Sequence, residues 1–123
     1  MKVIIAGSRS ITDRDVVYRA IADSWFNITE VVSGCAAGVD TFGEVWASEH
    51  NIPVKKFPAN WKEYGRAAGP IRNRHMAEYG DALIAIIENN SRGTTSMIKN
   101  AKQLGLNVFI VHIPSGKSER ILG

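Results

Sequence analysis

The chain has 123 residues, of which 45% are hydrophobic and 22% charged, so it is long enough for one globular domain and unlike a disordered or fibrous protein. The net charge of +3 is small, and Lys and Arg are spread along the sequence, which argues against a nucleic acid partner. The single cysteine, Cys35, excludes a disulfide framework and a cysteine zinc site and fits a cytoplasmic location. The apolar run before Gly7 is too short for a signal peptide or a membrane span, so no membrane partner is expected.

Short apolar runs alternate with helical patterns along the chain. The runs are mostly continuous, which is typical of parallel strands that are buried on both faces. Five strands are predicted on this basis, at 2–7, 29–33, 52–57, 82–87 and 107–113. Helices are predicted between them, from the capping residue Thr12 to Trp25 and over 39–49, 70–79 and 94–104.

This alternation predicts an α/β fold, a single Rossmann-like three-layer domain with a parallel five-stranded sheet in the order 3-2-1-4-5. The domain is expected to cover 1–113, and 114–123 is expected to be a loosely held C-terminal tail. The winding of the chain reverses between the first and fourth strands. Ligands of such sheets bind at that point, beyond the carboxyl ends of the strands.

The first turn at that edge, GSRS at 7–10, is a weak signal for a ligand site. It lacks the G-x-G-x-x-G fingerprint of dinucleotide-binding proteins. Ser8 and Arg9 either reach over a ligand or belong to an ordinary tight turn with a solvated arginine.

The second turn, SGCAAGVD at 33–40, is a stronger candidate. Gly34 and Gly38 would let backbone N–H groups approach a phosphate at the start of a helix, although the same glycines could serve turn geometry alone. The turn lacks the Lys-Ser/Thr pair of a P-loop, which argues against a triphosphate–magnesium site. Asp40 would lie in the first helical turn, either as a favourable dipole contact or as a carboxylate near a ribose.

The third turn, NNSRGTTS at 89–96, is rich in hydroxyl groups. Ser91, Thr94 and Thr95 offer side-chain donors, and Gly93 allows close approach of a ligand to the backbone. Helix capping alone accounts for two such residues, so the cluster exceeds what capping needs.

A fourth segment, YGRAAGPIRNRHM at 64–76, places arginines at the start of a helix, where a cation is unfavourable. Arg74 can pair with Glu78 four residues later on an exposed face. Arg72 instead shares a face with Met76 and should turn toward the protein. An inward arginine needs an anionic partner, and a ligand phosphate supplies one with bidentate geometry.

The motifs IIAGSR, SGCAAGVD, FPANW…G…AGPIRNRHM, DALIAI and RGTTSMIKNAKQLGLNVFIV together resemble the YspA-like branch of the SLOG superfamily, over nearly the whole of 2–113. They resemble more distantly the LOG phosphoribohydrolases, the Smf/DprA DNA-processing proteins and the molybdenum-cofactor carrier proteins. The resemblance implies a Rossmann-like fold and a nucleotide or nucleotide-derived ligand, such as an ADP-ribose derivative. It also implies a homodimer or a higher homo-oligomer, because many members dimerise.

Comparison with the LOG motifs assigns two positions. The arginine motif R-K-x-x-M resembles residues 72–76, which makes Arg72 the counterpart of the LOG arginine. The phosphate motif P-G-G-x-G-T-x-x-E resembles the stretch that ends at 97, so Met97 occupies the place of the catalytic glutamate. A thioether cannot shuttle protons, which argues against LOG-type hydrolysis unless Asp40, Glu44 or Glu88 substitutes.

The leading hypothesis is a binding protein that senses or sequesters a nucleotide-derived ligand, with its base covered by Trp61 or Tyr64. The alternatives are an N-glycosidic hydrolase of nucleoside monophosphates or nucleotide sugars, with Asp40 or Glu44 as catalytic candidates, and a DprA-like single-stranded DNA-binding protein. No metal and no resident cofactor are expected. The candidate ligand-binding residues are Gly7, Ser8, Arg9, Ser33, Gly34, Ala36, Gly38, Asp40, Trp61, Arg72, Asn73, Ser91, Gly93, Thr94 and Thr95.

Overall fold

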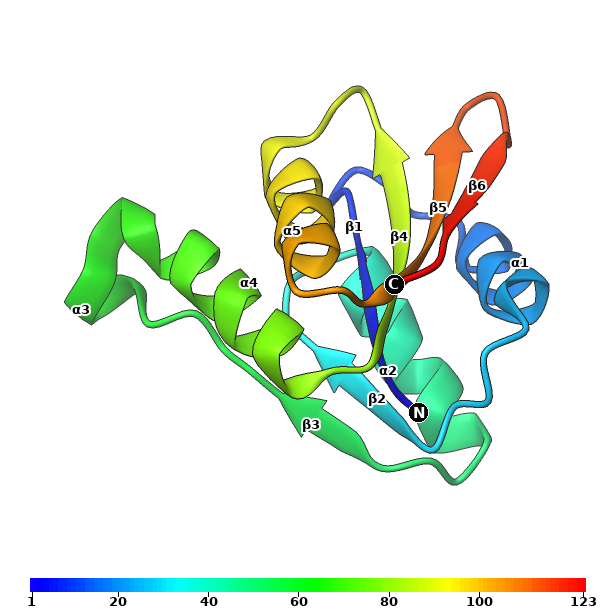
Figure 1. Ribbon diagram of the computed structural model, residues 1–123, viewed down its shortest axis with the longest axis horizontal. Helices are drawn as coiled ribbons and strands as arrows, with labels where there is room; N and C mark the ends of the chain where they lie inside the picture. Colours follow the sequence, from blue (N-terminus) through cyan, green and yellow to red (C-terminus); the bar gives the residue numbers. More distant parts are fainter.

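The computed structural model describes residues 1–123, and one six-stranded sheet runs through its centre (Figure 1). The strand order is β3-β2-β1-β4-β5-β6. The first five strands are parallel to their neighbours, and β6 is antiparallel to β5. The strands are β1 (Lys2–Gly7), β2 (Glu30–Ser33), β3 (Val54–Lys56), β4 (Ala82–Glu88), β5 (Asn107–Ile113) and β6 (Ser118–Ile121).

The sixth strand corrects the prediction of a fully parallel five-stranded sheet. It lies within 114–123, the segment expected to be a loose tail, and pairs with β5 from Val108↔Ile121 to Val111↔Ser118. A short turn with Gly116 at φ +75° connects the two strands, a conformation that suits glycine. The strand is missed in the sequence because its residues are mostly polar and exposed, so no apolar run marks it.

Helices cover both faces of the sheet. The α-helices are α1 (Arg14–Ser24), α2 (Val39–Glu49), α3 (Trp61–Tyr64), α4 (Ala68–Tyr79) and α5 (Arg92–Gln103), and a 3₁₀ turn, η1 (Gly65–Ala67), joins α3 to α4. The predicted cap of α1 is corrected from Thr12 to Asp13, whose carboxylate accepts a hydrogen bond from the Asp15 N–H at 2.9 Å. No helix of the chain has both the length and the apolar character that crossing a bilayer requires.

The core consists of two layers that share the central strands. Residues of α1 and α2, such as Val17 and Val39, pack with Ile5 on one face. Residues of α4 and α5, such as Met76 and Met97, pack on the other face. Because β1 and β4 contribute side chains to both layers, their sequences are apolar without interruption.

Parallel pairing places the carboxyl ends of β1, β2 and β4 at one edge of the sheet. The turns that follow these strands lead into α1, α2 and α5, so the last two helices begin at that edge. The second turn of α4 reaches the same place, because Arg72 contacts the turn after β2. The fold thus brings together four segments that lie far apart in the sequence.

Candidate functional site

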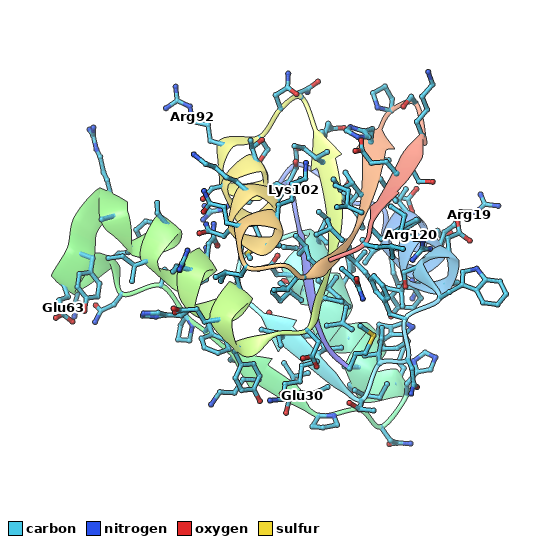
Figure 2. All side chains as sticks on the ribbon, viewed as in Figure 1. Arg19, Glu30, Glu63, Arg92, Lys102 and Arg120 are labelled. Carbon is cyan, nitrogen blue, oxygen red and sulfur yellow. The ribbon has the colours of Figure 1, made fainter.

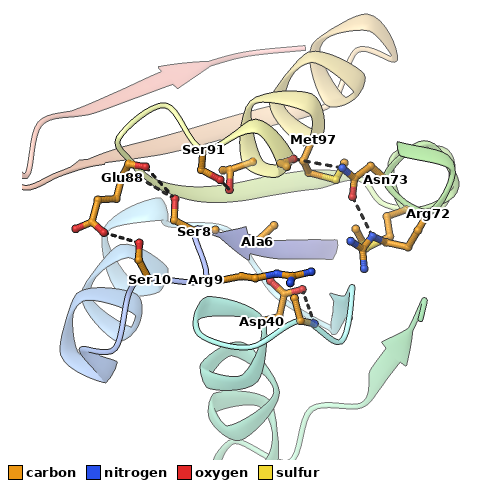
Figure 3. Close-up of a pocket in the computed structure, with 15 residues that line it drawn as sticks. Ala6, Ser8, Arg9, Ser10, Asp40, Arg72, Asn73, Glu88, Ser91 and Met97 are labelled. Atoms are coloured by element: carbon orange, nitrogen blue, oxygen red, sulfur yellow. Dashed lines mark hydrogen bonds between the residues drawn. The ribbon is translucent and has the colours of Figure 1, made fainter. Parts of the chain in front are cut away.

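A cavity of about 390 Å³ lies at the switch point between β1 and β4 (Figure 3). Its walls come from the ends of β1 and β4, the turn before α2, and the first turns of α4 and α5. Most of the candidate residues line it, namely Gly7, Ser8, Arg9, Ala36, Asp40, Arg72, Asn73, Ser91, Gly93 and Thr94.

Five candidates lie outside this cavity. Gly34 and Trp61 line a smaller hollow of about 150 Å³, which shares Arg9, Ala36 and Arg72 with the main one. Thr95 is exposed and lines neither hollow. The two remaining candidates, Ser33 and Gly38, have roles in the architecture of the turn.

Ser33 is buried, and its hydroxyl donates a hydrogen bond to Oε2 of Glu44 at 2.5 Å. Glu44 also lies 3.8 Å from the ammonium of Lys56. The carboxylate of this catalytic candidate is therefore engaged outside the main cavity.

Gly38 holds the second turn against the first. Its φ is +77°, and a Cβ there would lie 3.0–3.2 Å from the carbonyl oxygens of Ser8, Arg9 and Ile11. Only glycine lets the two backbones approach this closely without displacement. The GSRS turn and the turn before α2 therefore form one continuous wall.

Arg72 reaches across the wall of the cavity from the first turns of α4. Its Nη1 donates to the carbonyl oxygen of Gly34, and its Nε donates to Oδ1 of Asn73 at 3.0 Å. A Cβ on Gly34 would lie 2.7 Å from Nη1, so glycine leaves the space that the guanidinium occupies. Arg74, on the exposed side, lies 3.7 Å from Glu78, which confirms the predicted pair.

Arg9 and Arg72 face the same cavity without a carboxylate partner within 4.0 Å. In Figure 3 the side chain of Arg9 extends along the cavity toward Arg72. Burial lowers the pKa of Arg72, Asp40 offsets part of this effect, and the charge of Arg9 lowers the pKa further. Two like charges beside one cavity are unfavourable unless an anion binds between them.

Asn73 connects α4 to the start of α5. Its amide nitrogen donates to the carbonyl oxygen of Gly93 at 3.3 Å and lies 3.5 Å from Oγ of Ser96. The side chain is buried, and its Oδ1 accepts the hydrogen bond from Nε of Arg72. Through Asn73, the position of Arg72 is tied to the first turn of α5.

The helices α2 and α5 both begin at the cavity without a side-chain cap. The N-cap residues, Gly38 and Ser91, make no side-chain hydrogen bond to the first-turn N–H groups. The hydroxyl of Ser91 instead contacts Oγ1 of Thr94 at 3.3 Å. Free N–H groups and the helix dipole make the start of α5 favourable for an anion, because Ser91, Gly93 and Thr94 line the cavity there. The first turn of α2, by contrast, already holds the carboxylate of Asp40.

Two carboxylate residues, Asp40 and Glu88, line the same cavity. Asp40 is only 5% exposed, and its Oδ2 accepts a hydrogen bond from the Ala36 N–H at 3.2 Å. Burial raises the pKa of Asp40 from 3.8 to about 6, and the contact with Ala36 and the charge of Arg72 offset part of the effect. Glu88, at the end of β4, holds the other carboxylate, which accepts a hydrogen bond from Ser10.

Ser8 fastens β1 to β4 beside this carboxylate. Its Oγ accepts from the Glu88 N–H at 2.9 Å and lies 3.3 Å from the Glu88 carbonyl oxygen. The hydroxyl is therefore used within the protein. Its role at the cavity is to fix the ends of the two strands.

Sequence reasoning missed five lining residues as binding candidates, namely Ala6, Ser10, Met76, Glu88 and Met97. Ala6, Met76 and Met97 are nearly fully buried and look like core residues in the sequence, because nothing local shows that one side of them faces a cavity. The sequence does carry a signal for Ser10 and Glu88. Ser10 lies in the same turn as Ser8, and Glu88 stands where a strand ends at the ligand edge of the sheet. Nowhere in the chain do three or more His, Cys, Asp or Glu residues gather as metal ligands would.

Comparisons with known proteins agree with this architecture. DNA processing protein A (DprA) from Streptococcus pneumoniae has a similar solved structure, with a TM-score of 0.73 over 94% of this chain at 21% identity. The match covers 52% of that DprA chain, so the present chain spans about half its length, and the likeness concerns the fold.

A protein of Mycobacterium phage D29, the Gene 61 protein, is 32% identical over 118 residues, which cover 88% of this chain and 94% of the phage protein. The model of the YspA, cpYpsA-related SLOG family matches residues 1–64, which include β1, α1, β2, α2 and β3. The chain therefore belongs to the YspA, cpYpsA-related SLOG family.

Proposed function

We propose that the protein binds a nucleotide or nucleotide-derived ligand of the ADP-ribose type in the cavity at the carboxyl ends of the strands, and senses or sequesters it. The observation that carries this proposal is the convergence of Arg9, Arg72 and the uncapped start of α5 on one cavity. Neither arginine has a carboxylate within 4.0 Å. A ligand phosphate would satisfy both arginines and the N–H groups of the first turn of α5 together.

A thermal-shift panel tests the proposal, with AMP, NAD⁺, ADP-ribose and cyclic ADP-ribose as ligands. Ligand at about a hundred times its dissociation constant should add roughly 2.7 kcal/mol of stability. We expect at least one phosphate-bearing member to raise the melting temperature of the wild-type protein. If no member of the panel changes the melting temperature, the cavity is not a nucleotide site and the proposal fails.

The alternative of an N-glycosidic hydrolase rests on Asp40 and Glu88, the two carboxylates at the cavity. Met97, which replaces the LOG glutamate by resemblance, is buried at the cavity wall and supplies no acid or base. We expect no release of free base from the same panel when the mixtures are resolved by chromatography. Steady release that disappears in Glu88→Gln or Asp40→Asn would establish the enzyme instead.

A second alternative, single-stranded DNA as the ligand, is favoured by the unpaired arginines and by the fold shared with a protein named for DNA processing. Adding an oligo-dT strand to the panel decides between the two. DNA binding would weaken steeply as salt rises, because each neutralised phosphate releases a counterion. The homo-oligomer expected from the family resemblance stays a prediction, which light scattering of the purified protein tests.

A further inference from the structure

A second hollow, of about 380 Å³, lies beside the main cavity. It is bounded by α3, η1 and the first turns of α4 and α5, and we name it the arginine groove. The groove and the main cavity share Arg9, Arg72, Asn73 and Gly93. Each hollow alone falls within the roughly 300–1,000 Å³ range of single small-molecule sites, so together they form a longer site than a mononucleotide needs.

Charge is distributed unevenly between the two hollows. The arginine groove is lined by Arg9, Arg66, Arg72 and Arg92 and by no carboxylate. Arg66 and Arg92 are exposed and have no ion-pair partner within 4.0 Å, and Figure 2 shows Arg92 projecting away from the start of α5. The main cavity contains Asp40 and Glu88. A phosphate is therefore favoured in the groove and at the junction of the hollows, and is repelled deep in the main cavity.

An aromatic surface forms part of the arginine groove. Trp61 lines it and is 53% exposed. Its segment is fixed by Asn60, whose Oδ1 accepts a hydrogen bond from the Glu63 N–H at 3.2 Å. A Cβ on Gly69 would lie 3.4 Å from Cη2 of Trp61, so the indole rests against the start of α4. An exposed indole beside arginines suits a nucleobase, which stacks on aromatic rings and on guanidinium planes.

We propose that the arginine groove is a second subsite, which binds the aromatic end of a two-ended nucleotide derivative with a further phosphate on that end. The sugar end enters the main cavity, where Asp40 and Glu88 accept hydrogen bonds from its hydroxyl groups. A bridging phosphate lies between the two hollows, beside Arg9 and Arg72. This assignment rests on the proposed function and adds to it the orientation of the ligand and a preference for a terminal phosphate.

Calorimetric titration with three probes tests the proposal: ribose 5-phosphate, ADP-ribose, and ADP-ribose 2′-phosphate, which carries an extra phosphate on the adenosine. We expect the extra phosphate to raise the affinity about tenfold or more, as charge-assisted contacts do. In Arg66→Ala/Arg92→Ala this gain should disappear, and the affinity for ribose 5-phosphate should stay unchanged. Trp61→Ala should weaken ADP-ribose about fivefold or more and leave ribose 5-phosphate unaffected.

Arg74→Ala is the matched control, because Arg74 is an exposed arginine of α4 that lines neither hollow. Melting curves of all variants verify folding. If the wild type does not distinguish the two ADP-ribose probes, or if the double variant keeps the preference, the second subsite is wrong even though the proposed function stands. If none of the three probes and no member of the nucleotide panel binds, both proposals fail.

Discussion

Arg120 and Arg72 lie at opposite ends of the sheet, and their surroundings differ. Arg120, on β6, donates from Nη1 to the carbonyl oxygen of Ser24 at 2.7 Å and from Nη2 to that of Asp23 at 3.2 Å. These carbonyls lie at the end of α1, where the helix dipole favours a cation. Its guanidinium also lies 4.9 Å from the centre of the Phe109 ring. Arg120 thus contacts an aromatic ring and a helix end that favours a cation, both within the protein.

Arg72 lies at the other end of the sheet, as the fifth residue of α4. Like Arg120, it makes two hydrogen bonds within the protein, here to Gly34 and Asn73. It also faces Arg9 across the cavity, so one of its charged neighbours there is a second cation. The surroundings therefore distinguish the structural arginine, Arg120, from Arg72, the arginine that we propose binds a phosphate.

The largest expected effect concerns Asp40, whose buried carboxylate lowers the stability of the folded protein at the carboxyl ends of the strands. Its pKa is 3.8 when unfolded and about 6 when folded, so the folded state holds the proton more tightly between these values. The stability of the wild type should therefore fall as the pH rises from about 4 to about 6, with a total loss on the order of 3 kcal/mol. Asp40→Asn should remove this pH dependence and be more stable at pH 7.5, as measured by chemical denaturation.

Asparagine keeps an oxygen that can accept from the Ala36 N–H, so the substitution tests the charge rather than the hydrogen bond. If Asp40→Asn is less stable than the wild type at pH 7.5, the carboxylate is already compensated by Arg72. The charged groups at the carboxyl ends of the strands would then compensate one another, as the contacts of Arg120 compensate its charge at the amino ends. The contrast between the two ends of the sheet would be wrong.

Arg72→Ala tests the role proposed for Arg72 in the cavity at the carboxyl ends of the strands. We expect the affinity for ADP-ribose to fall more than tenfold, because a bidentate contact to phosphate is worth roughly 1.5–3 kcal/mol. The melting temperature without ligand should fall as well, since two hydrogen bonds to Gly34 and Asn73 are lost. Arg72→Lys, which keeps the charge without the planar fork, should recover only part of the affinity in the same titration.

Arg120→Ala tests the structural role of Arg120, which contacts the end of α1. It should lower the free energy of unfolding by about 1 kcal/mol through the loss of two hydrogen bonds to α1, and leave the affinity for ADP-ribose unchanged. Denaturation and titration of the same preparation measure both quantities. A loss of affinity in this variant would show that the two ends of the sheet are coupled and do not have separate roles.

The smallest effect is expected for Arg74→Ala. Arg74 and Glu78 form an exposed pair four residues apart, which contributes about 0.3–0.5 kcal/mol to stability. The affinity for ADP-ribose should stay within experimental error, so the variant sets the baseline for Arg72→Ala on the same helix. An equal loss in both variants would mean that general positive charge, rather than the position of Arg72, attracts the ligand.

The sequence predicts the core of the fold well because the signals there are local. The run at 82–87 and the run at 107–113 mark β4 and β5 almost residue for residue. The direction of Arg72 follows from its helical spacing to Met76, which is buried. The sixth strand escapes prediction because Glu119 and Arg120 carry the composition of a loop, and only pairing with β5 makes them a strand.

The turns of the candidate site can be predicted from the sequence, but the residues that form its walls cannot. Glycines and hydroxyls after a strand predict a ligand edge, and they indicate Ser8, Gly34 and Gly93 as candidates. The contact between Arg72 and Gly34 joins residues 38 apart in the sequence, and no local pattern specifies it. The apolar wall at Met97 is equally hidden, since a methionine beside a cavity and a methionine inside the core have the same sequence signature.

The sixth strand has a consequence for how the protein behaves at high concentration. Along Val108–Val111, β5 would otherwise present a row of unpaired backbone groups on an apolar strand, the kind of border on which other chains add to a sheet. Ser118, Glu119 and Arg120 replace that border with a short polar one. At the opposite border, β3 carries Lys55 and Lys56. Both borders of the sheet are thus unfavourable for edge-to-edge aggregation.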